Sequence, residues 1–352
     1  MNPLLATTLL IFVAGVLVAL PLLPALIELH LKQDAQPLAV IQQHAGEIRY
    51  FSDGFRTYIA SLLKPLQECV ARGNTARGTM PGNEQYLLLG TNSARLVSGS
   101  GKASACQLVV AAGVDVIFPK GITFAKEIYS AGKFTGGEKS VFRAVLGEKD
   151  IQLGQGSTVV RWAHAVGAFR AEQDCDLYGR ISSDREIHLK SGCAFQRLNA
   201  PRIALGREGV DSEVLPDIAP SSPPVGRRLF DEDLEILPGE IVYANIVSRG
   251  KLHVGRGARL LGSVKSHKHM VLDAGVRVEG ALVSASTIRI GPDCMISGPV
   301  IAEHEMYIEK GTSCGSFRAP TTVSAPTIQI AEGATVFGTL WARTEGQVVS
   351  PA

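Results

Sequence analysis

An 18-residue repeat is the feature that most narrows how this chain can fold. Segments of similar pattern recur at steps of 18 residues, with apolar residues at the first and third positions and usually glycine at the sixth. They are IQLGQGSTVVR (151–161), FRAEQDCDLYG (169–179), IHLKSGCAFQR (187–197), LHVGRGARLLG (252–262), MVLDAGVRVEG (270–280), IRIGPDCMISG (288–298), MYIEKGTSCGS (306–316) and, after a slip, IQIAEGATVFG (328–338). Alternating apolar positions predict short strands with one buried face. Because one coil cannot bury that face alone, stacked coils must share a core. The repeat therefore predicts an all-β fold, a parallel β-helix of about 18 residues per coil.

Two further positions of the repeat carry structural information. The sixth position is Asp174 or Asp293 in two segments, and aspartate in place of glycine indicates a corner with positive φ. The seventh position is small, and it is cysteine at Cys175, Cys193 and Cys294. We expect these cysteines to be buried apolar residues of the core. None of the 6 cysteines lies in a CxxC pair, so we predict no metal and no cofactor.

The chain begins with an apolar segment. Residues 3–27 carry no charged side chain, and a bilayer-spanning helix needs only about 20 apolar residues. A signal peptide would have basic residues before its apolar core, and none precedes this one. We therefore predict a retained transmembrane anchor within residues 1–30. Its apolar side chains include Leu4, Leu10, Phe12, Val16, Leu20 and Leu26.

The charges around the anchor predict its orientation. Only the α-amino group precedes the apolar segment, whereas Lys32 and further basic residues follow it. The positive-inside rule then places the bulk of the chain in the cytoplasm. The inverted topology would instead make the β-helix a periplasmic binding module. The whole chain has 35 basic and 33 acidic side chains, a balance that gives no reason to expect nucleic acid as a partner.

The chain divides into five predicted parts. A juxtamembrane helix is predicted because residues 38–70 place apolar side chains at steps of three and four. It can pack on the rest of the protein, or lie at the membrane interface. The parts are 1–30 (anchor), 31–83 (juxtamembrane helix and linker), 84–206 (first part of the β-helix, irregular before 143), 207–240 (Pro-rich insertion) and 241–345 (second part). We expect one continuous β-helix with a long insertion; two blocks joined by a tether are the alternative.

The stretch 241–342 resembles the bactofilin, or polymer-forming cytoskeletal, family. The similarity is carried by GKLHVGRGARLLGSVKS and AGVRVEGALVSASTIRIGPDCMISGPVIA. The resemblance implies a bacterial protein with a right-handed β-helix that assembles end to end without nucleotide and attaches to the inner membrane. A repeat surface without a catalytic constellation, joined to an anchor, predicts a non-enzymatic scaffold that self-associates and positions cell-envelope or polysaccharide machinery. This chain differs from the family in its full hydrophobic span, its long N-terminal region and its insertion.

The sequence leaves two functional hypotheses, self-association at a coil end and acyltransferase activity. Coil ends expose unpaired strand edges, so the last coil, with Phe337, Leu340 and Trp341, is the predicted self-association surface. The alternative is a left-handed, hexapeptide-type acyltransferase, because apolar residues also recur every six positions and leave the handedness open. Such an enzyme needs a histidine base. The candidates are His164, His253, His267, His269 and His304.

Overall fold

The computed structural model describes residues 48–92, 105–206 and 226–350, together with Leu9, Val13 and Leu20. From Ile48 onward the chain forms one compact unit. The predicted anchor over residues 1–30 lies outside the described residues except for those three positions, and Leu20 is exposed. Within the described ranges, no helix has both the length and the apolar character that a membrane crossing requires.

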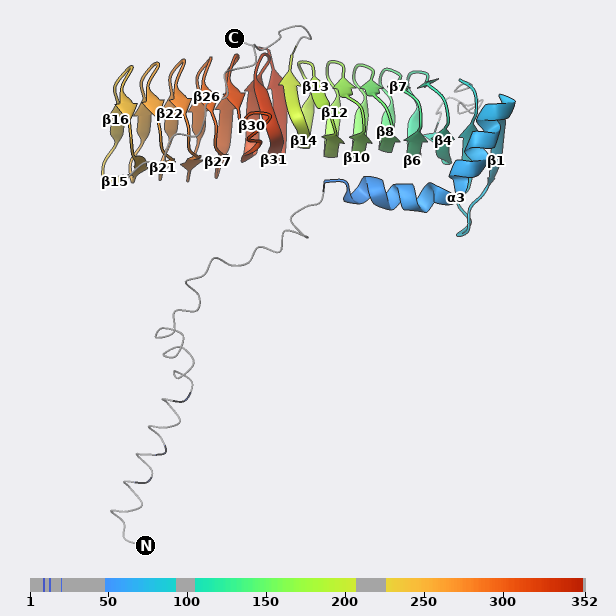
Figure 1. Cartoon of the computed structure of the whole chain (residues 1–352), viewed down its shortest axis with the longest axis horizontal. Helices are drawn as coiled ribbons and strands as arrows, with labels where there is room; N and C mark the ends of the chain where they lie inside the picture. The colour runs from blue at the N-terminus through green and yellow to red at the C-terminus, as the bar shows by residue number, and fades with distance from the viewer. Residues whose placement is uncertain are drawn as a thin grey trace. The chain divides into compact units, whose positions relative to one another are not determined.

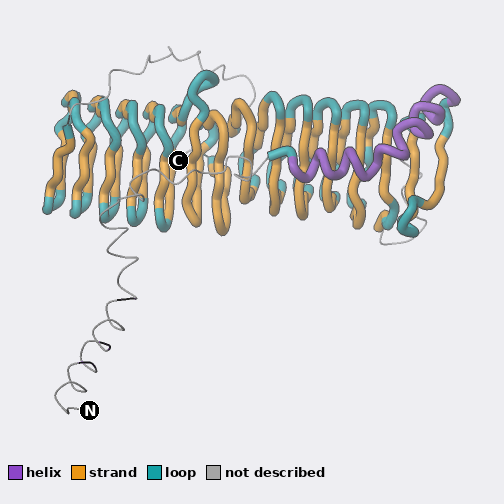
Figure 2. Tube along the Cα trace, turned by 60° about the horizontal axis from the view of Figure 1, so that its bottom comes forward, coloured by secondary structure: helices purple, strands orange, loops and turns teal. Residues whose placement is uncertain are grey.

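The predicted parallel β-solenoid is confirmed. Strands pair in parallel with partners one coil away, at the predicted step: Met270 lies beside Ile288, and Ile288 lies beside Met306. Each coil has three sides, and the coils stack along one axis (Figures 1 and 2). The sixth-position corners adopt positive φ as predicted, including 60° at Asp174 and 58° at Asp293. The cysteines of the repeat are fully buried in the core, also as predicted.

The first block of coils follows a hairpin of β1 (Thr75–Thr79) and β2 (Gln85–Leu89). Its strands are β3 (Ala105–Cys106), β4 (Val109–Ala112), β5 (Val116–Ile117), β6 (Thr123–Ser130), β7 (Phe134–Gly136), β8 (Val141–Gly147), β9 (Ile151–Leu153), β10 (Thr158–Ala165), β11 (Phe169–Ala171), β12 (Asp176–Ser183), β13 (Glu186–Leu189) and β14 (Ala194–Leu205). Strands that pair in parallel from coil to coil therefore occur from β3 onward, within the stretch before residue 143 where we expected irregular coils.

The second block starts inside the segment that we predicted to be an insertion. Its strands are β15 (Arg227–Phe230), β16 (Leu234–Ile236), β17 (Ile241–Val242), β18 (Asn245–Ser248), β19 (Leu252–Val254), β20 (Arg259–Leu260), β21 (Val264–Ser266), β22 (Met270–Leu272), β23 (Arg277–Val278), β24 (Leu282–Ser284), β25 (Ile288–Ile290), β26 (Met295–Ile296), β27 (Val300–Ala302), β28 (Glu305–Ile308), β29 (Ser313–Cys314), β30 (Thr321–Ala331) and β31 (Thr335–Val349). β15, β16 and β17 form its first coil, because each pairs in parallel with the strand one coil further on.

The two blocks meet through their last coils, and the stack changes direction there. β14 of the first block pairs with β31 of the second, and this pairing is antiparallel. We expected the second block to continue winding from residue 206 onward. Instead its first coil lies at the far end of the stack, and its last strand lies in the middle, beside β14 (Figure 1). One hydrophobic core nevertheless runs through both blocks.

One long helix covers part of the first block. α3 (Tyr50–Arg72) lies along one of the three sides of these coils, the side to which β2, β4 and part of β10 belong (Figure 2). Its apolar stripe, with Phe55, Ile59 and Leu62, is buried. The outward side chains beneath it are apolar too, among them Tyr129 and Leu146. For residues 50–70 the predicted helix is confirmed, and it packs on the rest of the protein, the first of the two interpretations.

Candidate interaction surfaces of the solenoid

The junction between the blocks is the best-defined interface of the structure. Across it, Leu198 lies opposite Leu340, and both are fully buried. On the outer face the guanidinium carbon of Arg197 lies 5.1 Å from the centre of the Trp341 ring. Beside it the Asn199 amide donates a hydrogen bond of 2.7 Å to Thr339 Oγ1. Apolar packing inside and polar contacts outside therefore hold the two blocks together.

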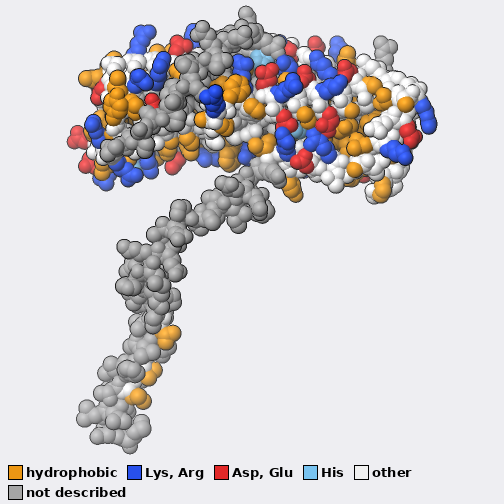
Figure 3. All heavy atoms as spheres, in the orientation of Figure 1, with side chains coloured by type: hydrophobic (Ala, Val, Ile, Leu, Met, Phe, Trp, Pro, Cys, Tyr) orange, Lys and Arg blue, Asp and Glu red, His pale blue; other side chains and the backbone are white. Residues whose placement is uncertain are grey.

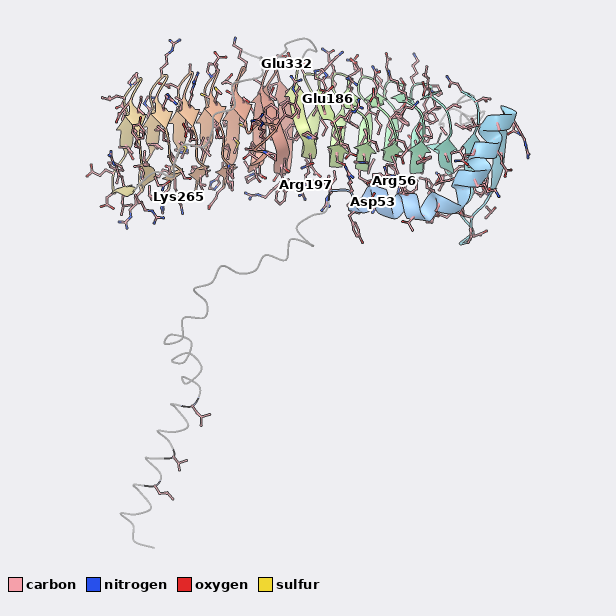
Figure 4. All side chains as sticks on the ribbon, viewed as in Figure 1. Asp53, Arg56, Glu186, Arg197, Lys265 and Glu332 are labelled. Atoms are coloured by element: carbon pink, nitrogen blue, oxygen red, sulfur yellow. The ribbon has the colours of Figure 1, made fainter. Side chains whose placement is uncertain are left out.

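A second contact crosses the junction at a corner of the coil. A carboxylate oxygen of Glu332 accepts a hydrogen bond of 3.1 Å from the backbone N–H of Ser191. Glu332 and Arg197 thus mark two sides of the same junction (Figure 4). Main-chain pairing supplies the rest, because β14 and β31 share an antiparallel register over eight residue pairs.

The predicted self-association surface is occupied by the junction. Leu340 and Trp341 contact the first block, and the Phe337 ring packs edge-on against Phe317 at 4.9 Å between centroids. The last coil is therefore not free to bind a second copy. The physical reason is proximity, since two coil ends in one chain meet at a far higher effective concentration than two ends in separate chains.

The end of the solenoid at the first block is closed. β1 runs antiparallel to β2 and forms the last strand of the stack, with the polar sequence TARGT. Leu87 and Leu89 of β2 are 1% and 0% exposed, and Met80 is also buried. The C-terminal turns of α3 pack against the same strand. A polar edge strand and a helix thus cover the core at this end.

The end at the second block is open within the described part of the chain. Phe230 and Leu234 pack against the core but stay partly exposed, although their register places them on the inward side. The same coil also carries three exposed large apolar side chains, Leu229, Leu237 and Ile241, and the exposed Tyr243 follows it directly. The strand edges of this coil face away from the stack (Figure 1), and hydrophobic side chains are visible on the surface at this end (Figure 3). We call the coil formed by residues 227–242 the open end.

A buried polar cluster lies beneath the start of α3. His164 is 2% exposed, and its Nδ1 lies 2.9 Å from Ser182 Oγ. Its Nε2 has no hydrogen-bond partner and lies 3.8 Å from the Asp184 carboxylate, which pairs with Arg49 at 2.7 Å. Burial lowers the pKa of His164, opposed in part by Asp184. The group is buried beneath the start of the helix, and its Arg49–Asp184 ion pair holds the helix to the coil.

The start of α3 is fixed by a second ion pair. Arg56 bridges Asp53 at 2.8 Å and Glu148 of the coil at 2.9 Å, and the Glu148 carboxylate raises the pKa of Arg56 (Figure 4). The charged pairs therefore sit where the apolar contacts of the helix end. Sequence reasoning missed this cluster because its partners are about 90 or more residues apart.

The other histidine candidates lie on the surface. His253 lies 3.1 Å from Asp273 and 3.6 Å from Glu235, on neighbouring coils. His267, His269 and His304 are exposed at corners of the coil. Over the described residues, no group of three or more potential metal-ligating side chains comes together.

A shallow cleft of about 280 Å³ lies beside the junction. Its lining includes Arg170, Arg202 and Glu186 of the first block and Phe317 of the second. Glu186 lies 3.1 Å from Arg170 and 4.0 Å from Arg202, so its carboxylate partly balances both guanidinium groups. The cleft is polar and shallow, and the arginines in it hold the coils together.

No known family, curated protein or solved structure matches the chain.

Proposed function

We propose that the protein is a non-enzymatic, membrane-anchored scaffold of the bactofilin kind, which self-associates through its β-helix and positions envelope or polysaccharide machinery. The observation that carries the proposal is the uninterrupted core, which runs through both blocks and ends in an exposed apolar coil. A stack of parallel coils is stiff and has long ordered sides, which suits a support better than a catalyst. The apolar segment at residues 3–27 would hold it at the inner membrane, with the coils in the cytoplasm.

The attachment can be tested in bacterial cells. The full chain should fractionate with membranes, and a chain that starts at residue 31 should be soluble. A fluorescent reporter that folds only in the cytoplasm should be active at the C-terminus. Activity of a reporter that works only in the periplasm would contradict the orientation, and equal solubility of both chains would contradict the anchor.

The self-association can be tested on the detergent-solubilised full chain. Native mass spectrometry, or light scattering corrected for detergent, should give a mass of more than one copy. A monomer at the highest soluble concentration would contradict the proposal. The supporting role itself predicts that partner proteins lose their localised pattern in cells when the chain is deleted, while the chemistry of each purified partner is unchanged.

A further inference from the structure

We propose that two copies of this chain join through their open ends, in an antiparallel and two-fold symmetric contact, and that assembly stops at two. This inference rests on the proposed self-association and specifies its surface, its symmetry and its stoichiometry. The partner is a second copy of the same chain, and no other protein is needed to cover the coil of residues 227–242.

The first argument is continuity with the junction inside the chain. Leu340, which lies opposite Leu198 there, is on the side of the second block where β31 pairs with Val323 of β30. That side runs through β27, β24, β21 and β18 and ends at β15. The strand at the open end is therefore the far terminus of the same side that already pairs antiparallel with another coil. An end-to-end antiparallel contact is thus a geometry that this solenoid adopts once.

The second argument is the charge pattern of β15 and the corner after it. The strand begins with Arg227 and Arg228, continues with Leu229 and Phe230, and leads into the acidic corner Asp231, Glu232 and Asp233. Antiparallel pairing of this strand with its own copy places the basic start of each beside the acidic corner of the other. A parallel arrangement would align like charges, which is unfavourable. The strand is therefore self-complementary only in the two-fold orientation.

One register of the two antiparallel copies of β15 places opposite charges beside each other and keeps inward side chains opposite inward side chains. With Leu229 opposite Leu229 of the partner subunit, inward positions face inward positions, as antiparallel pairing requires. Arg228 then lies opposite Phe230 of the partner subunit, and Arg227 lies opposite Asp231 of the partner subunit. A shift of two residues in one direction would instead bring the two copies of Arg228 together.

The third argument limits the assembly to two copies. Among the described residues, β1, β2 and α3 cover the other end on the side of β4, and both last coils are used in the junction. A chain with one open end can form a closed isologous pair but has no second surface from which to grow. The end-to-end polymer that the bactofilin resemblance implies would need two open ends. We therefore expect a rod of two chains, with its four blocks in line.

Oxidative cross-linking of the full chain in mild detergent tests the contact. Leu229→Cys should give a covalent dimer in high yield, because two-fold symmetry brings the two new thiols together. Background is low, since all of the cysteines in the described residues are buried. Ile301→Cys, on the same outward row in the middle of the block, and Thr79→Cys, on the closed end, are the matched controls and should stay monomeric under non-reducing denaturing conditions.

A charge reversal with rescue tests the register. Arg227→Asp should raise the dimer dissociation constant about tenfold, because two symmetry-related ion pairs are lost. Adding Asp231→Arg in the same chain should restore most of the affinity. Failure of the second change to restore dimerisation would overturn this register.

The outcomes separate the two proposals. Two-copy particles that cross-link at position 229 alone support the inference. A multimer that cross-links at position 301, or a ladder of species that cross-links at both 229 and 79, overturns it and leaves self-association standing. A folded wild-type chain that is monomeric by native mass spectrometry overturns both.

Discussion

Leu198 in β14 and Leu340 in β31 lie directly opposite each other, across the point where the direction of the solenoid reverses. Neither side chain has exposed surface, although their strands come from coils about 140 residues apart in the chain. The pair closes a core that would otherwise be open at the last coil of each block. The stability of the two blocks should therefore be coupled through it.

The first prediction concerns this pair. Leu198→Ala and Leu340→Ala should each lower the free energy of unfolding by about 2–5 kcal/mol, because each leaves a cavity in a closed core. The double variant should lose less than the sum of the two, since the residues share one site. Denaturant titration followed by circular dichroism measures this cycle. Ile301→Ala, a partly exposed residue of a middle coil, is the control and should cost far less. Strict additivity would contradict the contact.

The second prediction concerns α3. Ile59→Asp should detach the helix from the coil, because a carboxylate would replace a fully buried side chain. Trp162, whose ring lies 5.7 Å from that of Phe55, should then become exposed and its fluorescence should shift to the red. Ala60→Asp, on the exposed side of the helix, is the matched control. An unchanged Trp162 signal in the Ile59 variant would show that the helix does not cover this side.

The third prediction concerns pH. Burial lowers the pKa of His164 below its ordinary value of about 6.5, so the unfolded chain binds this proton more readily than the folded one. Its contribution to stability is therefore complete above that pH and is lost as the pH falls below it. His164→Gln should flatten this part of the stability profile. Measurement of the unfolding midpoint between about pH 7.5 and about pH 5 distinguishes this variant from the wild-type chain.

The fourth prediction concerns the thiols. Burial raises the pKa of Cys294 to about 11 and that of Cys314 to about 12, so neither forms the reactive thiolate at neutral pH. A thiol-specific chromogenic reagent should react slowly with the native chain and with all 6 cysteines once the chain is unfolded in guanidinium. Rapid reaction of one thiol in the native chain would mean that a coil opens locally.

The fifth prediction concerns a coil corner. Gly275 has a φ of 72°, with no atom within 4 Å of the place where a Cβ would be. A substitution at Gly275 should therefore lower stability because of the positive φ, and not because the new side chain would clash with its surroundings. Gly275→Val should lower stability by about 1–2 kcal/mol, whereas Gly275→Asn should cost less because asparagine tolerates the left-handed region. Equal losses in thermal unfolding would contradict this account of the corner.

The coil architecture was predictable because its signals are local. An apolar residue recurs at the first position of each repeat, as Met270 and Ile288 do 18 residues apart, and Asp293 takes the place of glycine at a corner. These residues specify where a strand lies and where the chain turns. The same locality explains why the positions of the buried cysteines within the repeat were enough to assign them to the core.

The reversal at the junction was not predictable by the same means. A period of 18 residues is the same in either chain direction, and the β14–β31 pairing rests largely on backbone hydrogen bonds that any apolar strand can make. One signal did exist. Leu229 and Leu237 are apolar residues in the stretch 207–240, which its prolines led us to interpret as an insertion. Both side chains are exposed at the open end, which is where we propose that two copies meet.

The reversal of the coil direction between the two blocks leaves residues 227–242 at the open end, and a pair of engineered disulfides tests this arrangement most directly. Asn199 lies opposite Thr339 across the junction, with their side chains 2.7 Å apart. Asn199→Cys combined with Thr339→Cys should form an intramolecular disulfide, detected by peptide mass spectrometry, and should leave the chain folded. The control combines Asn199→Cys with Leu229→Cys. It tests the alternative in which the coils continue in one direction, so that β15 stacks directly on β14. A disulfide between positions 199 and 339 and none within the chain between 199 and 229 is the result that we predict. An intramolecular disulfide between 199 and 229 would contradict the reversal, and with it the open end.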